Sequence, residues 1–181
     1  MSIARPNADE YSPFYHAYVQ CVPEGDLLTL LEEQSDDVRA LAAVIGEVRA
    51  GTPYAPGKWS AKDIFLHIAD TERVMAYRAL RVARADVTPL ASFEQDDYVR
   101  VGAANRRSLA DILDELQAVR TATIALFRGL DEEALARFGV ASGKPVTARA
   151  LAFIIAGHER HHLRLLREQP GYLTGAPQAS A

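Results

Sequence analysis

Apolar residues recur along most of the chain at intervals of three and four, the spacing that places them on one face of an α-helix. Four long segments carry this pattern, and each begins at a residue that can cap a helix: Asp26 to about Ala50, Ser60 to about Arg84, Ser108 to about Arg128, and Thr147 to about Arg167. No segment alternates convincingly between apolar and polar residues. The pattern predicts an all-α four-helix bundle.

The remaining segments predict connections and ends of the bundle. Residues 1–25 combine prolines with aromatic residues and predict an N-terminal arm that packs on the body. Residues 85–105 predict a long connection with one short helical turn, and residues 138–145, with two glycines, predict a loop or a short extended piece. The expected organisation is an arm over 1–25, a single bundle over 26–168 and a flexible tail over 169–181.

Composition narrows the class of protein. With 181 residues, 49% hydrophobic and 24% charged, the chain matches one globular domain. A net charge of −4 argues against nucleic acid as a partner. The single cysteine, Cys21, excludes an internal disulfide, and neither a membrane span nor a signal-peptide core is visible. We therefore expect a cytoplasmic protein that does not bind a membrane.

The fourth helical segment places histidines on its apolar face. His158 and His162 continue the stripe of Leu151 and Ile155, so both imidazoles should face the core. Buried imidazoles need hydrogen-bond partners or a metal. Two histidines four residues apart project in nearly the same direction, which is the spacing of a chelate.

The same residues match the H-E-x-x-H signature of zinc proteases, with Glu159 as a general base. That class of enzyme needs a third ligand downstream. The only carboxylate side chain after His162 is Glu168, which would point away from the apolar face, and no histidine follows. A third ligand must come from upstream, and the protease interpretation loses its support.

His67 supplies the missing ligand, because it lies on the apolar stripe of the second helix. Inward side chains on facing helices build the metal sites of helical bundles. Three neutral imidazoles suit Zn²⁺, Ni²⁺, Fe²⁺ or Cu²⁺ and leave coordination positions open. We predict a metal site of His67, His158 and His162. His161 could replace His162 through its three-residue spacing from His158, but more readily lies at the edge of the stripe.

Two stretches together resemble the DinB-like superfamily of damage-inducible four-helix proteins: Gly57-Lys58-Trp59-Ser60 with His67-Ile68-Ala69-Asp70-Thr71-Glu72-Arg73, and Gly157-His158-Glu159-Arg160-His161-His162. The resemblance extends over roughly residues 20–168. It implies an up-down-down-up bundle, the three-histidine site already named, nickel or zinc as the metal, a stress-response setting and a homodimer. Some relatives use a low-molecular-weight thiol such as bacillithiol, mycothiol or glutathione.

Four further residues are candidates for roles beside the metal. Asp70 could orient a ligand from the second helix, and Glu72 could do so or pair with an arginine. Glu159 could act as a catalytic base or remain a solvated charge, and His161 could support the ligands or an interface. For each of them an ordinary structural role is the alternative.

Two classes of function remain after these exclusions. In the first, an enzyme uses a metal to activate water or a thiol for attack on a small molecule, as a hydrolase or a thiol-dependent transferase does. In the second, the metal only joins the helices and stabilises the fold of a non-catalytic stress-response or binding module. Open coordination positions favour the enzyme. The lack of an obvious base or substrate-anchoring motif favours the module.

Overall fold

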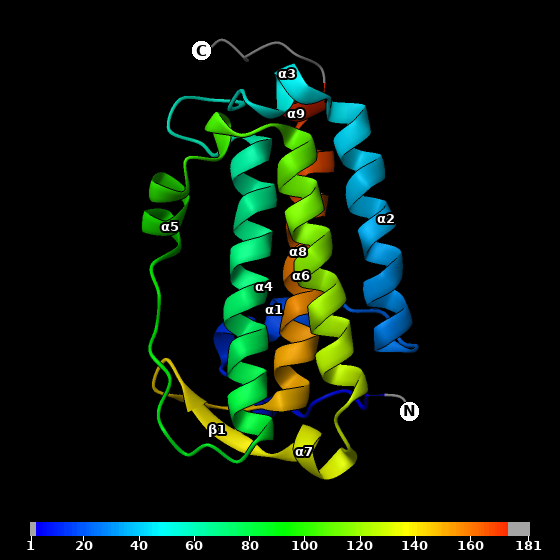
Figure 1. Ribbon diagram of the computed structural model, residues 1–181, viewed down its shortest axis with the longest axis vertical. Helices are drawn as coiled ribbons and strands as arrows, with labels where there is room; N and C mark the ends of the chain where they lie inside the picture. Colours follow the sequence, from blue (N-terminus) through cyan, green and yellow to red (C-terminus); the bar gives the residue numbers. More distant parts are fainter. Residues whose placement is uncertain (1–2, 174–181) are drawn as a thin grey trace.

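The computed structural model describes residues 3–173. Its body is a bundle of four long helices, α2 (Leu27–Ile45), α4 (Ala61–Ala83), α6 (Leu109–Arg128) and α8 (Ala148–Glu168). In Figure 1, α2 and α8 run upward while α4 and α6 run downward. The predicted all-α fold and its up-down-down-up order are therefore confirmed.

Each long helix begins where the sequence predicted. The side chains of four residues accept a hydrogen bond from the backbone N–H three positions ahead, which satisfies a donor that the first helical turn leaves free. These residues are Asp26, Ser60, Ser108 and Thr147.

The first long helix is shorter than predicted. Gly46 has φ +73°, a conformation that glycine adopts without strain, and it ends α2 after Ile45. The chain then resumes as the separate short helix α3 (Glu47–Ala50). The apolar spacing continues across the break, so the spacing alone did not reveal it.

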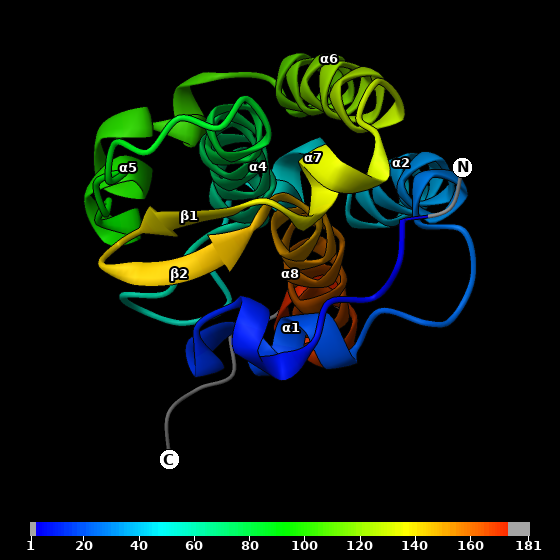
Figure 2. The same cartoon turned by 90° about the horizontal axis from the view of Figure 1, so that it is seen from below.

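Short elements close the two ends of the bundle. The long connection between α4 and α6 holds α5 (Gln95–Gly102) and the 3-10 turn η3 (Ala104–Arg106), and α7 (Glu132–Ala136) follows α6. At 138–145, where a loop or a short extended piece was expected, the chain is extended and forms a hairpin: β1 (Phe138–Ala141) pairs antiparallel with β2 (Lys144–Thr147), with Phe138 opposite Thr147. The hairpin crosses the lower end of the bundle (Figure 2).

The N-terminal arm comprises the 3-10 turns η1 (Ala8–Glu10) and η2 (Pro13–Tyr15) and the helix α1 (His16–Gln20). Figure 2 shows α1 on the outer side of α8. Contact between the two is close at Gly157, where an added Cβ would lie 2.0 Å from the backbone oxygen of Tyr18. Because this neighbour is backbone, only glycine at position 157 permits the approach.

The first residues of the C-terminal tail expected from residue 169 pack on the bundle. Pro170–Leu173 form the short helix α9, in which Tyr172 is buried and its hydroxyl donates to the Trp59 carbonyl at 2.7 Å. The aromatic ring at 172 holds this segment on the bundle. Residues 174–181 of the predicted tail lie outside the described residues.

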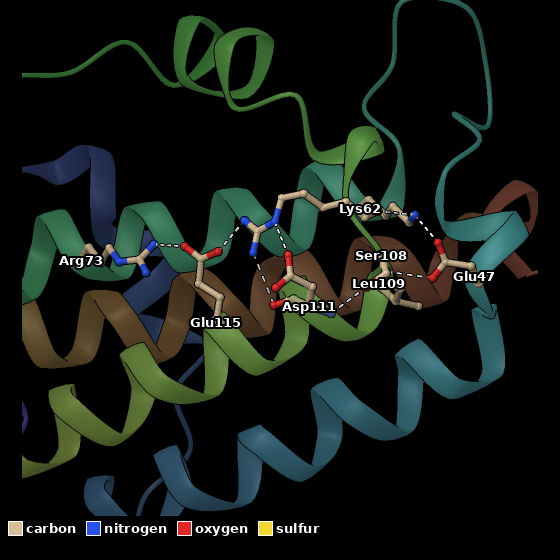
Figure 3. A network of polar contacts seen from close by, with 8 residues as sticks. Glu47, Lys62, Arg73, Ser108, Leu109, Asp111 and Glu115 are labelled. Carbon is tan, nitrogen blue, oxygen red and sulfur yellow. Dashed lines mark hydrogen bonds and ion pairs between the residues drawn. The ribbon is translucent and has the colours of Figure 1, made fainter.

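A polar network fixes the upper ends of α4 and α6 (Figure 3). Glu47 accepts from the ammonium of Lys62 and from the backbone N–H of Leu109, at 2.8 Å for the latter. Further along, Glu115 pairs with Arg73 of α4 and with Arg107, which precedes α6. The network joins the two parallel neighbours that the long connection separates in sequence.

The apolar core is divided in two. One cluster fills the lower part of the bundle around Leu151 and Ile155, and a second fills the upper part around Ile64 and Leu163. Between them lies a layer of buried polar side chains, which we call the polar layer: Gln34, His67, Thr71, Glu72, Arg120, Thr123, His158, Glu159 and His162. Within residues 3–173, no helix is long and apolar enough to cross a membrane.

Candidate metal centre

Three histidines of the polar layer form one cluster, which we call the histidine cluster. His67 comes from α4, and His158 and His162 come from successive turns of α8. Nε2 of His158 lies 3.0 Å from Nε2 of His67 and 3.1 Å from Nε2 of His162. One nitrogen from each of the three rings falls within 4.8 Å of the others. The structure thus brings together the three residues predicted as ligands; that they bind a metal stays a prediction.

Burial keeps these imidazoles neutral. The exposed fractions of His67, His158 and His162 are 3%, 6% and 9%. Burial lowers the pKa of His67 to about 4, although the charge of Asp96 opposes the shift. Burial, helped by the neighbouring histidines, lowers the pKa of His162 to about 3 and that of His158 well below its ordinary value. Neutral imidazole is the form that ligates a metal.

The donor chemistry of the cluster fits a cation. A neutral imidazole nitrogen carries either a proton or a lone pair. Nε2 of His158 faces two other Nε2 atoms, so a single proton or lone pair cannot satisfy both contacts. Three lone pairs directed at one cation would satisfy all three nitrogens at once. The residues present therefore fit a divalent metal.

Three neighbours that sequence reasoning missed surround the cluster. The rings of Trp59 and His67 have centroids 4.9 Å apart, and the rings of Tyr18 and His158 meet edge to face at 5.5 Å. Thr71 Oγ1 lies 3.5 Å from Nδ1 of His67. Thr71 follows His67 by one helical turn, which was a usable signal. Nothing in the periodicity of the four helices indicated that the arm reaches His158.

Asp70 and Glu72 each pair with an arginine. Asp70 faces Arg73, at 3.6 Å, and it is Thr71 that stands at the second nitrogen of His67. Glu72 binds Arg120 through both carboxylate oxygens, at 2.9 and 2.7 Å. The arginine partner considered for Glu72 is therefore the one observed.

Glu159 also turns away from the histidines. Its Oε2 accepts from Arg120 at 2.8 Å, while Oε1 is buried and has no hydrogen-bond partner among the described residues. Arg120 is 1% exposed and also donates to the carbonyl of Leu31 at 2.8 Å. We call Arg120, Glu72 and Glu159 the arginine cluster. Its geometry gives Glu159 a structural partner in place of the predicted catalytic contact.

The arginine cluster holds two carboxyl groups around one guanidinium. Burial raises the pKa of Glu159 to about 7, although the charge of Arg120 opposes the shift. The two carboxylates in turn raise the pKa of Arg120 above its ordinary value, against the effect of burial. Arg120 follows Leu116 by four residues and so lies on the apolar face of α6, which was the sequence signal for its burial.

His161 lies outside the histidine cluster. Its ring is half-buried between Tyr18 and His162, with centroids at 5.3 and 5.1 Å. It lines a separate cavity of about 450 Å³ together with Cys21 and three arginines of α8. Burial and the charge of Arg164 lower its pKa.

A second cavity reaches the histidine cluster. It has a volume of about 230 Å³, and His158 forms part of its wall. The arm, α4, α8 and the segment before α5 contribute the other walls. A molecule in this cavity would lie against a ring of the histidine cluster.

Comparison with known proteins identifies relatives of this chain. The family model described as the DinB superfamily matches residues 30–166. A protein of Geobacillus thermodenitrificans named "Putative metal-dependent hydrolase" is 21% identical over 150 residues, which are 80% of this chain and 84% of that protein.

Solved structures share the fold. YfiT from Bacillus subtilis, described as a probable metal-dependent hydrolase with an unusual four-helix bundle topology, superposes with a TM-score of 0.71 at 17% identity, over 92% of this chain and 94% of YfiT. A mycothiol-dependent maleylpyruvate isomerase gives 0.65 at 13% identity, over 81% of this chain and 61% of that one. The DinB-like protein YjoA from Bacillus subtilis gives 0.60 at 19% identity, over 87% and 96%.

Proposed function

This chain belongs to the DinB superfamily, and from that membership and the histidine cluster we propose that it is a metal-dependent hydrolase of a small molecule. His67, His158 and His162 are the proposed metal ligands. The name of the Geobacillus relative and the description of YfiT support this class of reaction.

The observation that carries the proposal is the convergence of three neutral imidazole nitrogens beside a cavity. A purely structural role would leave each ring with a hydrogen-bond partner of its own, as buried polar groups normally have. Here Nδ1 of His162 has no partner among the described residues, and the Nε2 atoms face one another. Such an arrangement favours metal binding over three core histidines that are each satisfied by a separate hydrogen bond.

Three protein ligands leave room for water and substrate, as catalytic zinc sites do. When bound, the metal would lower the pKa of its water and polarise a substrate oxygen. The chain's own residues hold the ligands in place. Thr71 is positioned to orient the His67 ring through Nδ1, and Trp59 covers that ring from the side.

A thiol-dependent reaction is the second candidate. The cavity wall at His158 offers Glu94 as its only carboxylate, and Glu159 is engaged with Arg120. A thiolate bound by the metal is a nucleophile without needing a protein base. The mycothiol-dependent isomerase that shares the fold supports this alternative.

Metal analysis of purified variants tests the ligand assignment. We expect about one divalent metal per chain in the parent protein and loss of at least nine-tenths of it in His67→Ala and His158→Ala. His16→Ala is the matched control, because His16 contacts Tyr11 and lies outside the cluster. Full occupancy in both ligand variants would refute the site.

Turnover assays separate the two reactions. The metal-loaded protein should hydrolyse some members of a panel of small esters, amides and lactones without an added thiol. If turnover appears only with bacillithiol, mycothiol or glutathione and an electrophile, the thiol-dependent reaction is the correct one. His158→Ala should abolish either activity.

A further inference from the structure

Three arginines of α8 have no part in the histidine cluster or the arginine cluster. Arg160, Arg164 and Arg167 are spaced by four and three residues, which places them on one face of the helix. Together they line the cavity of about 450 Å³ to which His161 also contributes, and which we call the basic cavity. The remaining walls come from the arm, α2 and α8 itself. In a protein with a net charge of −4, positive charge is thus concentrated around one hollow.

The guanidinium groups of these arginines keep most of their donors free. Nε of Arg160 donates to the Cys21 carbonyl at 3.0 Å, which holds this side chain in place. Its two terminal nitrogens donate to no acceptor among the described residues. Arg164 and Arg167 each face a carboxylate, at 3.9 and 3.8 Å, and both distances are too long for a hydrogen bond. Each guanidinium has five N–H donors, so the basic cavity is rich in donors that an anion can use.

The usual role of arginines near the end of a helix is to offset the negative end of its dipole, an effect confined to the last turn. Arg167 lies in the last turn of α8 and fits that role, but Arg164 and Arg160 lie about one and two turns earlier. Asp37 of α2 is the only carboxylate among the lining residues, and it offsets one of the three guanidinium charges. The lining therefore stays positive overall, which the helix dipole alone does not require.

The chemistry of the lining indicates the class of ligand. A planar guanidinium presents a fork of N–H donors that matches the oxygens of a phosphate or a carboxylate. Several such forks around one hollow favour a ligand with at least two negative charges over a ligand with a single charge. A volume of about 450 Å³ lies in the range of small-molecule sites, so the cavity has room for more than a lone ion.

We propose that the basic cavity binds a small molecule that carries a phosphate or paired carboxylates, at a site separate from the histidine cluster. The three arginines hold the anionic groups of this molecule. His161 lines the cavity and its ring lies 5.1 Å from that of His162, so the anion site adjoins the metal centre without sharing a ligand with it. The site goes beyond the proposed function, and binding there needs no metal.

A divalent cation at the histidine cluster would also attract anions, so the test has to separate the two centres. Butyl phosphate, with close to two negative charges at about pH 8, and butanesulfonate, with a single charge, have the same apolar chain. Isothermal titration calorimetry compares both probes on the zinc-loaded full chain and on the metal-free full chain after removal of the chelator. We expect butyl phosphate to bind at least tenfold more tightly than butanesulfonate to both proteins, and higher salt to weaken its binding.

Matched variants assign the binding to the basic cavity. Arg164→Gln should weaken butyl phosphate at least fivefold, and the fold should persist because this side chain is exposed. Arg100→Gln, an exposed change on α5, is the control and should leave the affinity unchanged. Asp37→Asn removes the opposing carboxylate from the lining and should tighten binding, whereas Asp36→Asn, an exposed change next to it on α2, should not.

The single cysteine reports from the wall of the basic cavity. Burial raises the pKa of the Cys21 thiol, and the charges of Arg160 and Arg164 oppose that shift. An anion beside these arginines weakens their effect on the thiol and also covers the wall, and the thiolate is the reactive form. Saturating butyl phosphate should therefore slow the alkylation of Cys21 by iodoacetamide at least fivefold, as measured by mass spectrometry of the chain.

Three results would overturn the inference: equal affinity for the two probes, an unchanged rate of Cys21 alkylation, or binding that is lost with the metal and kept in Arg164→Gln. The last result would place the anion at the histidine cluster. A protein that holds no metal but binds butyl phosphate through Arg164 would contradict the hydrolase proposal and leave the anion site standing.

Discussion

His158 and Glu159 are neighbours in the sequence, yet they belong to two polar clusters with opposite designs. The arginine cluster is charged, and each of the three guanidinium nitrogens donates to a carboxylate or to a backbone carbonyl. The histidine cluster is neutral, and its nitrogens face one another instead of separate partners. Both clusters join α8 to α4 in the same layer of the bundle. The arginine cluster thus joins helices through partners within the chain, whereas the nitrogens of the histidine cluster converge on one point and lack separate partners.

Removing Arg120 should produce the largest effect. Arg120→Ala leaves two buried carboxylates without their cation, and breaking a buried pair in this way costs about 3–5 kcal/mol of unfolding free energy. Arg128→Ala, on the same helix, removes an exposed pair with Glu32 and should cost no more than about 1 kcal/mol. Urea denaturation of both variants measures the difference. Equal losses would show that the arginine cluster does not hold the helices.

The two clusters should also respond to pH in opposite directions in chelator-treated protein. The pKa of His67 falls from 6.5 to about 4 on folding, so stability is lost as the pH falls through that window. The pKa of Glu159 rises from 4.5 to about 7, so its contribution is lost as the pH rises through that window. Each group changes the free energy of unfolding by about 1.4 kcal/mol per pH unit.

Two substitutions test which group causes each change of stability with pH. His67→Asn should reduce the slope of the acid limb, to which His158 and His162 also contribute, and Glu159→Gln should reduce the opposing slope between pH 5 and 7. Urea denaturation at several pH values in the presence of a chelator provides the measurement. A curve that neither substitution changes would disprove the assigned shifts.

Chelation should leave the fold in place, a smaller effect than the loss of Arg120. The two apolar clusters above and below the polar layer bury their large side chains without a metal, at roughly 1.5–3 kcal/mol each. We expect full helical circular dichroism at 25 °C and one cooperative transition after chelation. The Co²⁺-substituted protein should change its absorption spectrum when a thiol is added. Unfolding on chelation, with a cobalt spectrum indifferent to thiols, carboxylates and azide, would instead support a structural staple.

The smallest effect should come from His161. His161→Ala should retain most of the metal, because this ring lies outside the histidine cluster. It lines instead the separate cavity of about 450 Å³ that Cys21 and three arginines of α8 also line. His162→Ala should lose nearly all of it, because its Nε2 lies 3.1 Å from that of His158. Elemental analysis of the two proteins compares the losses. Equal losses would mean that α8 presents a different face to the metal.

The sequence predicted most of the fold because helix periodicity and capping residues are local signals. His67, His158 and His162 were also predictable, since each interrupts an apolar stripe with a ligating side chain. The arginine cluster depends on which faces of α4, α6 and α8 meet, which only the tertiary packing determines. The hairpin at 138–147 has strands of four residues, too short for a clear alternation. The expected homodimer and cytoplasmic location stay predictions.

The position of the arm has an evolutionary consequence. The family match begins at residue 30, whereas Tyr15 and Tyr18, which form one wall of the cavity, precede it. All three histidines lie inside the matched range. The arm thus adds one wall to the cavity beside His158, whose other walls, like the histidines, come from the matched range. Exchange of the first thirty residues could therefore change this one wall of the cavity and leave the three histidines unaltered.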